Sequence, residues 1–138
     1  MRVFDERTVR LPEGSRATVC ADVAECVSTA DVVFEAVHEE LDAKRKLIGL
    51  VQAAAGPIPV ASNTSTFCPS ELTPGLRYPG SVLVAHFFNP ADVVPLVEVV
   101  PGPLTTASAQ TAVRTFLTEA NKAVITLERE IEGFVANR

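Results

Sequence analysis

Closely spaced glycines are missing from this sequence. Its seven glycines stand at positions 14, 49, 56, 75, 80, 102 and 133, and no two of them are separated by a single residue. A G-x-G-x-x-G loop, the glycine-rich turn that holds the pyrophosphate of a dinucleotide, therefore occurs nowhere in the chain.

Other absences narrow the class of protein. No apolar run approaches the ~20 residues of a membrane-spanning helix, and the first 14 residues (MRVFDERTVRLPEG) carry charges where a signal peptide is apolar. With a net charge of -5 and a pI of about 5.0, the chain lacks the basic character that nucleic-acid binding requires. Hydrophobic residues make up 47% of the 138 residues, which excludes a disordered chain and indicates one globular domain.

Cysteines are few. Cys20, Cys26 and Cys68 include no C-x-x-C pair, so we predict neither a disulfide framework nor a metal site. Free thiols favour a reducing, cytoplasmic location. Cys68 precedes a proline and could be a nucleophile, but a small, partly buried side chain is the favoured interpretation.

Strands and helices are predicted to alternate along the chain. Short apolar runs predict strands over residues 16–20, 31–37, 58–61, 81–86, 96–100 and 123–127. Helices are predicted over residues 23–30 with Asp22 as cap, over 38–54 with Leu47, Val51 and Ala54 on one face, and over 69–72. A further helix is capped by Thr105 or Thr106 and carries an apolar stripe from Ala109 to Ala120, whereas residues 1–15 are expected to be irregular.

This alternation predicts an α/β fold with a mostly parallel, doubly wound sheet and flanking helices. One connection departs from the pattern. The link between His86 and Leu96 is too short for a crossover helix, so these two strands are expected to be antiparallel or to diverge locally.

Polar residues follow the predicted strands, where ligands bind in open parallel sheets. They are His38, Glu39 and Glu40 after the second strand, residues 62–66 (SNTST) after the third, His86 and residues 87–90 (FFNP) after the fourth, and Arg129, Glu130 and residues 133–137 after the last. Structural alternatives exist, because Ser, Asn and Thr clusters are common in turns and a histidine at a strand end is often structural.

Glu98 lies inside an apolar strand, LVEVV, where an ionised carboxylate is costly without a partner. His86 is the nearby residue in sequence that could pair with it. A histidine oriented by a buried carboxylate is suited to act as a general base. The alternative is that Glu98 lies on an exposed edge strand and faces water, and the spacing leaves both interpretations open.

Five stretches resemble the NAD-binding domain of L-3-hydroxyacyl-CoA dehydrogenases. They are ADVVFEAVHEELDAKRKL, ASNTST, HFFNP, PLVEVV and GFVANR, in the family's order and at its approximate spacings, and the resemblance extends from about residue 22 to the end. It implies a Rossmann-like fold, NAD as cofactor and an acyl-CoA substrate. The implied reaction is the oxidation of (3S)-3-hydroxyacyl-CoA to 3-oxoacyl-CoA, as in fatty-acid β-oxidation.

The resemblance also implies roles for individual residues. His86 resembles the general base that takes the proton of the substrate 3-hydroxyl, and Glu98 resembles its orienting carboxylate. Ser65 and Asn137 resemble the pair that hydrogen-bonds the substrate oxygen. The residues implied in cofactor binding are Glu39 and Lys44, one helical turn apart in the predicted helix, together with Asn89 and Ser65.

The sequence departs from the family at both ends. The family begins with a strand, a G-x-G-x-x-G loop and a helix, and it continues after GF-x-x-NR into a helical domain. We therefore expect residues 1–130 to form a partial Rossmann-like domain, truncated at its N-terminal βαβ unit, and residues 131–138 to start the connection to an absent helical domain.

Two alternatives remain for the function. The chain could be a truncated, non-catalytic domain, completed by a partner or by assembly into a homo-oligomer. It could also be a related dehydrogenase that acts on carnitine or on a sugar acid.

Overall fold

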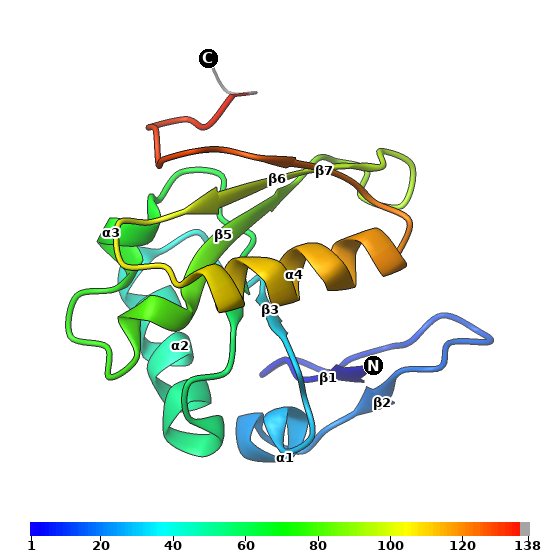
Figure 1. Ribbon diagram of the computed structural model, residues 1–138. Coiled ribbons are helices and arrows are strands. Elements are labelled where there is room, and N and C mark those ends of the chain that lie inside the picture. The colour runs from blue at the N-terminus through cyan, green and yellow to red at the C-terminus, as the bar shows by residue number, and fades with distance from the viewer. Residues whose placement is uncertain (136–138) are drawn as a thin grey trace.

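Short apolar segments, each containing valine, form a five-stranded sheet in the computed structural model, which describes residues 1–135 (Figure 1). The strand order is β3 (Val33–Glu35), β4 (Val60–Ser62), β5 (Val82–Phe87), β6 (Leu96–Pro101) and β7 (Ala123–Thr126). Neighbouring strands are parallel except β5 and β6, which are antiparallel. The predicted α/β fold and mostly parallel sheet are confirmed, and the short link after His86 takes the antiparallel alternative.

Four α-helices flank this sheet: α1 (Val23–Val27), α2 (Leu41–Ala55), α3 (Pro69–Leu72) and α4 (Ala107–Glu119), with a 3₁₀ turn, η1 (Pro79–Ser81). Asp22 caps α1 through Glu25 N at 2.8 Å, as predicted. Of the two candidate caps for α4, Thr106 accepts the hydrogen bond from Ala109 N, at 3.3 Å. No helix within residues 1–135 combines the length and apolar character needed to cross a membrane.

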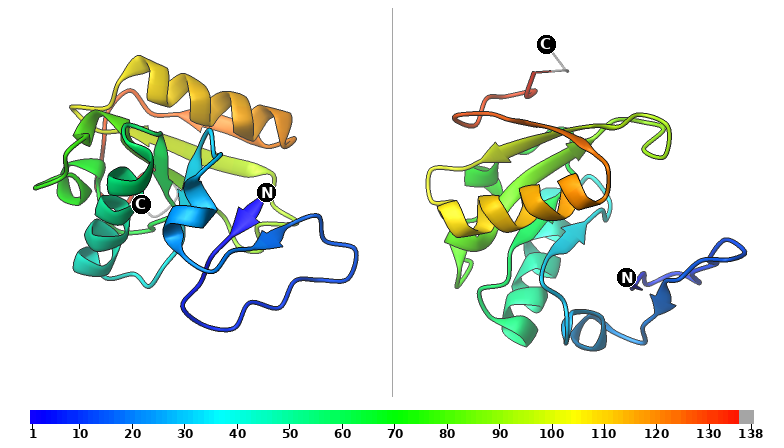
Figure 2. Two further views of the ribbon diagram at one scale, coloured as in Figure 1. Left: turned by 90° about the horizontal axis from the view of Figure 1, so that it is seen from below. Right: turned by 45° about the vertical axis from the view of Figure 1, so that its right-hand side comes forward.

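Alternate residues of each strand face two separate cores, because successive side chains point to opposite faces of a sheet. One core joins the sheet to α1, α2 and α3, and the other joins it to α4; Figure 2 (left) shows the sheet between these layers. Val82 and Val84 face α2, whereas Leu83 and Ala85 face α4. The same alternation puts His86 and Glu98 on the α2 side of the sheet.

The start and the buried face of α2 differ from the prediction. The helix begins at Leu41 rather than at residue 38, because Glu40 is extended (φ -134°) and serves as the N-cap. Glu39 therefore precedes the helix. The buried residues of α2 are Lys44, Ile48, Val51 and Gln52, whereas the predicted Ala54 is exposed. The predicted face is displaced because two long polar side chains, Lys44 and Gln52, are turned inward to hydrogen-bond partners.

The N-terminal part contradicts two predictions. Residues 16–20 do contain a strand, β2 (Thr18–Val19), but it pairs in parallel with β1 (Arg2–Val3) in a separate two-stranded sheet. Residues 1–15 are therefore not wholly irregular. Both residues of β2 are exposed, so the strand has no apolar face to bury against the main sheet. The two strands lie to one side of that sheet (Figures 1 and 2).

Gly102 lies where the chain leaves β6, close to α3. A Cβ on this residue would stand 2.7 Å from Pro69 Cβ, a distance at which one of the two elements must shift. We expect Gly102→Ala to lower the free energy of unfolding by about 1–3 kcal/mol, measured by urea denaturation.

Gly49 supplies the matched control. It lies inside α2, and a Cβ there would meet only Leu76 Cδ2, at 3.9 Å. Gly49→Ala is expected to stabilise the protein by about 0.5–1 kcal/mol. Equal effects of the two substitutions would contradict the close approach at Gly102.

Candidate active site

His86 and Glu98 face each other across the antiparallel pair β5–β6, where they are register partners. His86 Nδ1 lies 2.9 Å from Glu98 Oε2, and the two residues are 5% and 2% exposed. An ionised carboxylate only accepts hydrogen bonds, so in the neutral imidazole this contact places the proton on Nδ1 and leaves the lone pair on Nε2. The predicted contact is present, and the alternative of a water-facing Glu98 on an edge strand is wrong.

Aromatic rings and a backbone amide surround this pair. The His86 ring lies 5.0 Å from the ring of Phe88 and 5.3 Å from that of Phe134, between centroids. The second oxygen of Glu98, Oε1, accepts a hydrogen bond from Val135 N at 3.0 Å. Both carboxylate oxygens therefore have protein partners, and the pair is shielded from water, which strengthens its electrostatic interaction.

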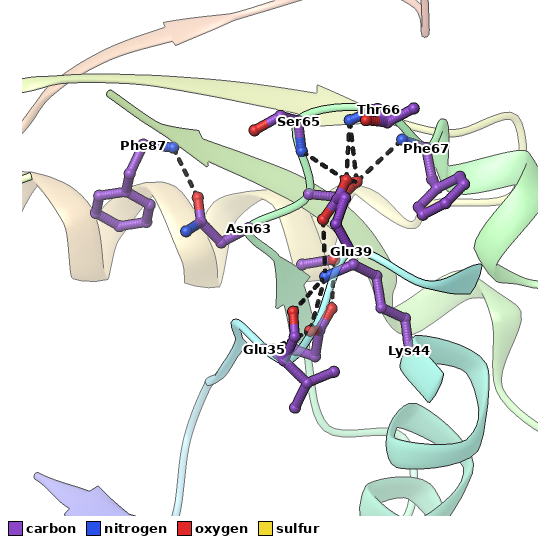
Figure 3. A network of polar contacts seen from close by, with 11 residues as sticks. Glu35, Glu39, Lys44, Asn63, Ser65, Thr66, Phe67 and Phe87 are labelled. Carbon is purple, nitrogen blue, oxygen red and sulfur yellow. Dashed lines mark hydrogen bonds and ion pairs between the residues drawn. The ribbon is translucent and has the colours of Figure 1, made fainter. Parts of the chain in front are cut away.

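A second buried carboxylate, Glu35, ends strand β3 (Figure 3). Its Oε1 accepts from Lys44 Nζ at 3.0 Å and from Val37 N at 2.7 Å, and the Ser62 hydroxyl donates to Oε2. Lys44 also donates to the carbonyl of Val37, at 3.2 Å. Glu35 and Lys44 are 2% and 0% exposed, so this ion pair ties α2 to β3 inside the core.

Glu39 connects that ion pair to the loop after β4. One oxygen lies 3.3 Å from Lys44 Nζ, and the other accepts from the Thr64 hydroxyl and from the amides of Ser65 and Thr66, at 3.0 and 3.1 Å. Partial burial acts to raise the pKa of Glu39, but the Thr64 hydrogen bond and the Lys44 charge outweigh it and hold this pKa below its usual value. The loop is thereby fixed to a charged group.

Asn63 joins the carboxyl ends of three strands. Its backbone N–H donates to the backbone carbonyl of Glu35 at 2.7 Å, and its side-chain Oδ1 accepts from Phe87 N at 3.0 Å. Figure 3 shows this link from β4 to Phe87, the residue after His86. The ends of β3, β4 and β5 therefore form one connected polar edge.

Asn89 lies in the loop that leaves this edge. The residue is exposed. Lys122, just before β7, donates to the carbonyls of Ala91 at 2.5 Å and Val94 at 3.4 Å. These bonds attach the loop carrying Asn89 to the body of the domain.

The predicted site residues thus have different surroundings. His86 and Glu98 are paired, while Ser65 and Asn89 are exposed at the carboxyl ends of β4 and β5. Lys44 is wholly buried by partners from this chain, and it contacts the part-exposed Glu39 through an ion pair at 3.3 Å. Asn137 lies outside the described residues. Its role stays a prediction, as do the roles of the others.

Sequence reasoning missed Glu35, and it placed Ser62 and Asn63 among the polar residues 62–66 without predicting their partners. The sequence did contain a sign that Glu35 is special, because this carboxylate lies within an apolar run, DVVFEAV. The free-energy cost of burying a charge, which implied a partner for Glu98, applies equally to Glu35. Ser62 and Asn63 had no such signal, since polar residues after a strand are common in ordinary turns.

Cys68 has the surroundings of a structural thiol. Its amide donates to Glu71 Oε2 at 2.8 Å at the start of α3. Burial, together with the charges of Glu130, Glu71 and Glu132, raises the pKa of the Cys68 thiol. A protonated thiol is a poor nucleophile, which supports the interpretation of Cys68 as a small packing residue.

Comparison with known proteins identifies the family. The family model for 3-hydroxyacyl-CoA dehydrogenase, NAD binding domain, matches residues 8–131. The chain belongs to this family. The resemblance of its motifs is thereby confirmed, and NAD is the cofactor of the dehydrogenase domain that it represents.

Individual relatives carry two kinds of name. L-carnitine dehydrogenase of Streptomyces griseus is 41% identical over 133 residues, which cover 93% of this chain and 39% of the relative. That of Nocardiopsis dassonvillei is 44% identical over 117 residues, covering 84% and 36%. The solved structure of (S)-3-hydroxybutyryl-CoA dehydrogenase PaaH1 from Ralstonia eutropha has a TM-score of 0.82 and 29% identity, covering 88% of this chain and 43% of that one. The chain thus spans less than half the length of these proteins.

Removal of the Lys44 ammonium leaves Glu35 charged and buried without its main partner. We expect Lys44→Met to lower the free energy of unfolding by roughly 3–5 kcal/mol, measured by denaturant titration. Lys46→Met, two residues away on the exposed face of α2, is the matched control and should change it by about 0.5 kcal/mol or less. A Lys44 variant as stable as its control would show that Glu35 does not depend on the ion pair.

The lowered pKa of Glu39 predicts a pH dependence. A carboxyl group with a lowered folded-state pKa stabilises the fold above its unfolded pKa, and this contribution is lost as the pH falls through the folded value. Glu39→Gln should therefore be less stable than the parent at neutral pH, by about 1 kcal/mol or less for this part-exposed group. The difference should shrink as the pH falls below the usual glutamate range.

Glu40→Gln controls for the loss of a charge at the same end of α2, because the Glu40 side chain makes no capping hydrogen bond. Its stability difference from the parent should be small and nearly independent of pH. If the two variants gave the same pH profile, Glu39 would have no special role in fixing the loop.

Proposed function

We propose that this chain oxidises the 3-hydroxyl of a short 3-hydroxyacyl compound, with His86 as the general base and NAD as the hydride acceptor. The substrate proposed first is (3S)-3-hydroxyacyl-CoA, which would become 3-oxoacyl-CoA. The observation that supports the proposal is the buried pair of His86 and Glu98, because the contact at Nδ1 leaves Nε2 of the neutral imidazole as the atom that can accept a proton.

The residues at the polar edge suit the reactive end of NAD. Ser65 and Asn89 offer a hydroxyl and an amide at exposed positions, and the Glu39 side chain is 40% exposed. When bound, NAD accepts the hydride that leaves substrate C3. The sequence contains no G-x-G-x-x-G loop, so we assign none of these residues to the pyrophosphate.

The proposed proton transfer follows from the tautomer of His86. Nε2 takes the proton of the 3-hydroxyl as the carbonyl forms, and Glu98 stabilises the resulting imidazolium through Nδ1–H. The rings of Phe88 and Phe134 keep water from the imidazole faces. Ser65, with Asn137, would donate to the substrate oxygen as charge develops on it.

L-carnitine is the second candidate substrate. The relatives from Streptomyces griseus and Nocardiopsis dassonvillei, 41% and 44% identical, are L-carnitine dehydrogenases. Carnitine also carries a secondary hydroxyl on C3 of a butanoyl chain, so the acid–base chemistry proposed for His86 applies without change. The two candidates differ on both sides of the reacting carbon: C1 is a CoA thioester in one and a free carboxylate in the other, and only carnitine carries a quaternary ammonium on C4.

Replacement of the general base tests the proposal. The chain is assayed in the oxidation direction with NAD and either (3S)-3-hydroxybutyryl-CoA or L-carnitine, by following NADH absorbance. We expect His86→Gln to lower kcat by roughly 10²–10⁴-fold, because the side-chain amide of glutamine cannot act as a base. The larger kcat/KM of the parent identifies the substrate.

His38→Gln is the control, since His38 is the chain's other histidine and is exposed. It should retain the activity of the parent. Equal turnover by His86→Gln and the parent would contradict the role of His86. Absence of turnover on both substrates would overturn the activity proposed for this polypeptide, while its family would stand.

A further inference from the structure

Phe134 has an unusual backbone conformation. Its φ is +52°, directly after Gly133 at +74°, and a bulky residue is rarely found in the left-handed region. The turn is closed by a hydrogen bond from Phe134 N to Ile131 O at 3.0 Å. Such a conformation persists only where the surrounding structure holds it, and such residues cluster at functional sites.

This turn contacts both members of the buried pair. The Phe134 side chain is 0% exposed, and its ring lies 5.3 Å from the His86 ring at an interplanar angle of 50°. The next residue donates its amide to Glu98, from Val135 N to Oε1 at 3.0 Å. The left-handed turn thus places a ring on the histidine and an N–H on the carboxylate at the same time.

We propose that Phe134 is a positioning residue that holds His86 in the Nδ1–H tautomer bonded to Glu98. The catalytic meaning of this role rests on the proposed function, but the tautomer itself does not. Phe134 also belongs to the apolar core that includes Leu72 and Val100. If Phe134 served only to fill the core, any apolar side chain of similar volume would be sufficient. Such a role would not require the contact of the Phe134 ring with His86 or the hydrogen bond from Val135 N to Glu98.

Two contacts explain how the turn acts on the histidine. Phe134 and Phe88 limit rotation of the imidazole, so that Nδ1 stays directed at Glu98. The Val135 amide occupies Oε1, which keeps the carboxylate from turning and leaves Oε2 for the histidine. If the turn loosens, water competes for His86 Nδ1 and for Glu98 Oε2. The proton of the imidazole can then move to Nε2, the atom needed as base.

Nuclear magnetic resonance of the histidine rings tests this directly, because the chain has two histidines and His38 is exposed. Long-range ¹⁵N–¹H spectra should show His86 as a single Nδ1–H tautomer in the parent. In Phe134→Leu we expect a mixture of tautomers and Nδ1–H exchange with water that is at least about tenfold faster. His38, recorded in the same spectra, should not change.

Phe116→Leu is the matched control. Phe116 is 46% exposed on α4, and its ring contacts Phe34 at 5.1 Å rather than His86. This variant should leave the His86 spectrum unaltered. A folded Phe134→Leu with the parent tautomer and exchange rate would overturn the proposal, and so would an equal change in the Phe116 variant.

A measurement on the parent keeps the test independent of the variant's folding. The Val135 amide should be protected from hydrogen exchange by its bond to Glu98, and exchange at the rate of an exposed peptide would overturn the proposal. If Phe134→Leu does not fold, Phe134→Met retains volume without the ring and takes its place. Should the parent show no turnover while the tautomer shift occurs, the proposed function fails and the positioning role stands.

Discussion

A carboxylate that is removed from water must be given partners, and this constraint organises the whole polar edge of the sheet. Glu98 and Glu35 are both at most 2% exposed, and each has both oxygens hydrogen-bonded by the chain. Their partners come from strands, a helix and loops, at sequence separations from 2 residues (Val37 and Glu35) to 37 residues (Val135 and Glu98). Each of those elements is therefore held in place by a hydrogen bond or ion pair to a buried carboxylate, which would be costly without its partners.

The two carboxylates use different solutions. Glu98 is balanced by a histidine and a backbone amide, so its surroundings contain a group that can gain and lose a proton. Glu35 is balanced by the side-chain ammonium of Lys44, with which it forms an ion pair. The first arrangement suits acid–base chemistry. The second gives a fixed scaffold from which Glu39 reaches the loop that carries Ser65, and Asn63 links that scaffold to the strand that carries His86.

The sequence alone predicted those features whose cause is local. It also indicated contacts in cases where a buried charge has few possible partners. Asp22 and Thr106 cap helices through residues three positions away, and the apolar runs became strands. His86 was the partner expected for a buried Glu98, because the short link between the two strands leaves few choices, but the spacing alone left open whether Glu98 is buried. The start of α2 could not be predicted, since Glu39 is drawn out of the helix by residues 64–66, about 25 positions away. Helical periodicity also treats Lys44 as a surface residue, and the pairing of β1 with β2 is too short to leave a periodic signal.

The antiparallel register of β5 and β6 has a consequence for how such a domain can vary. The distance between His86 and Glu98 is fixed by the ladder, in which Phe87 pairs with Val97 and His86 with Glu98. Beyond Phe88, whose ring lies against His86, residues 89–95 connect the two strands outside that ladder, so insertions or deletions in this stretch leave the acid–base pair in place. A single residue inserted within β5 would instead turn His86 to the α4 side. Selection can therefore remodel the loop beside the histidine for new substrates while the chemistry of the pair is preserved.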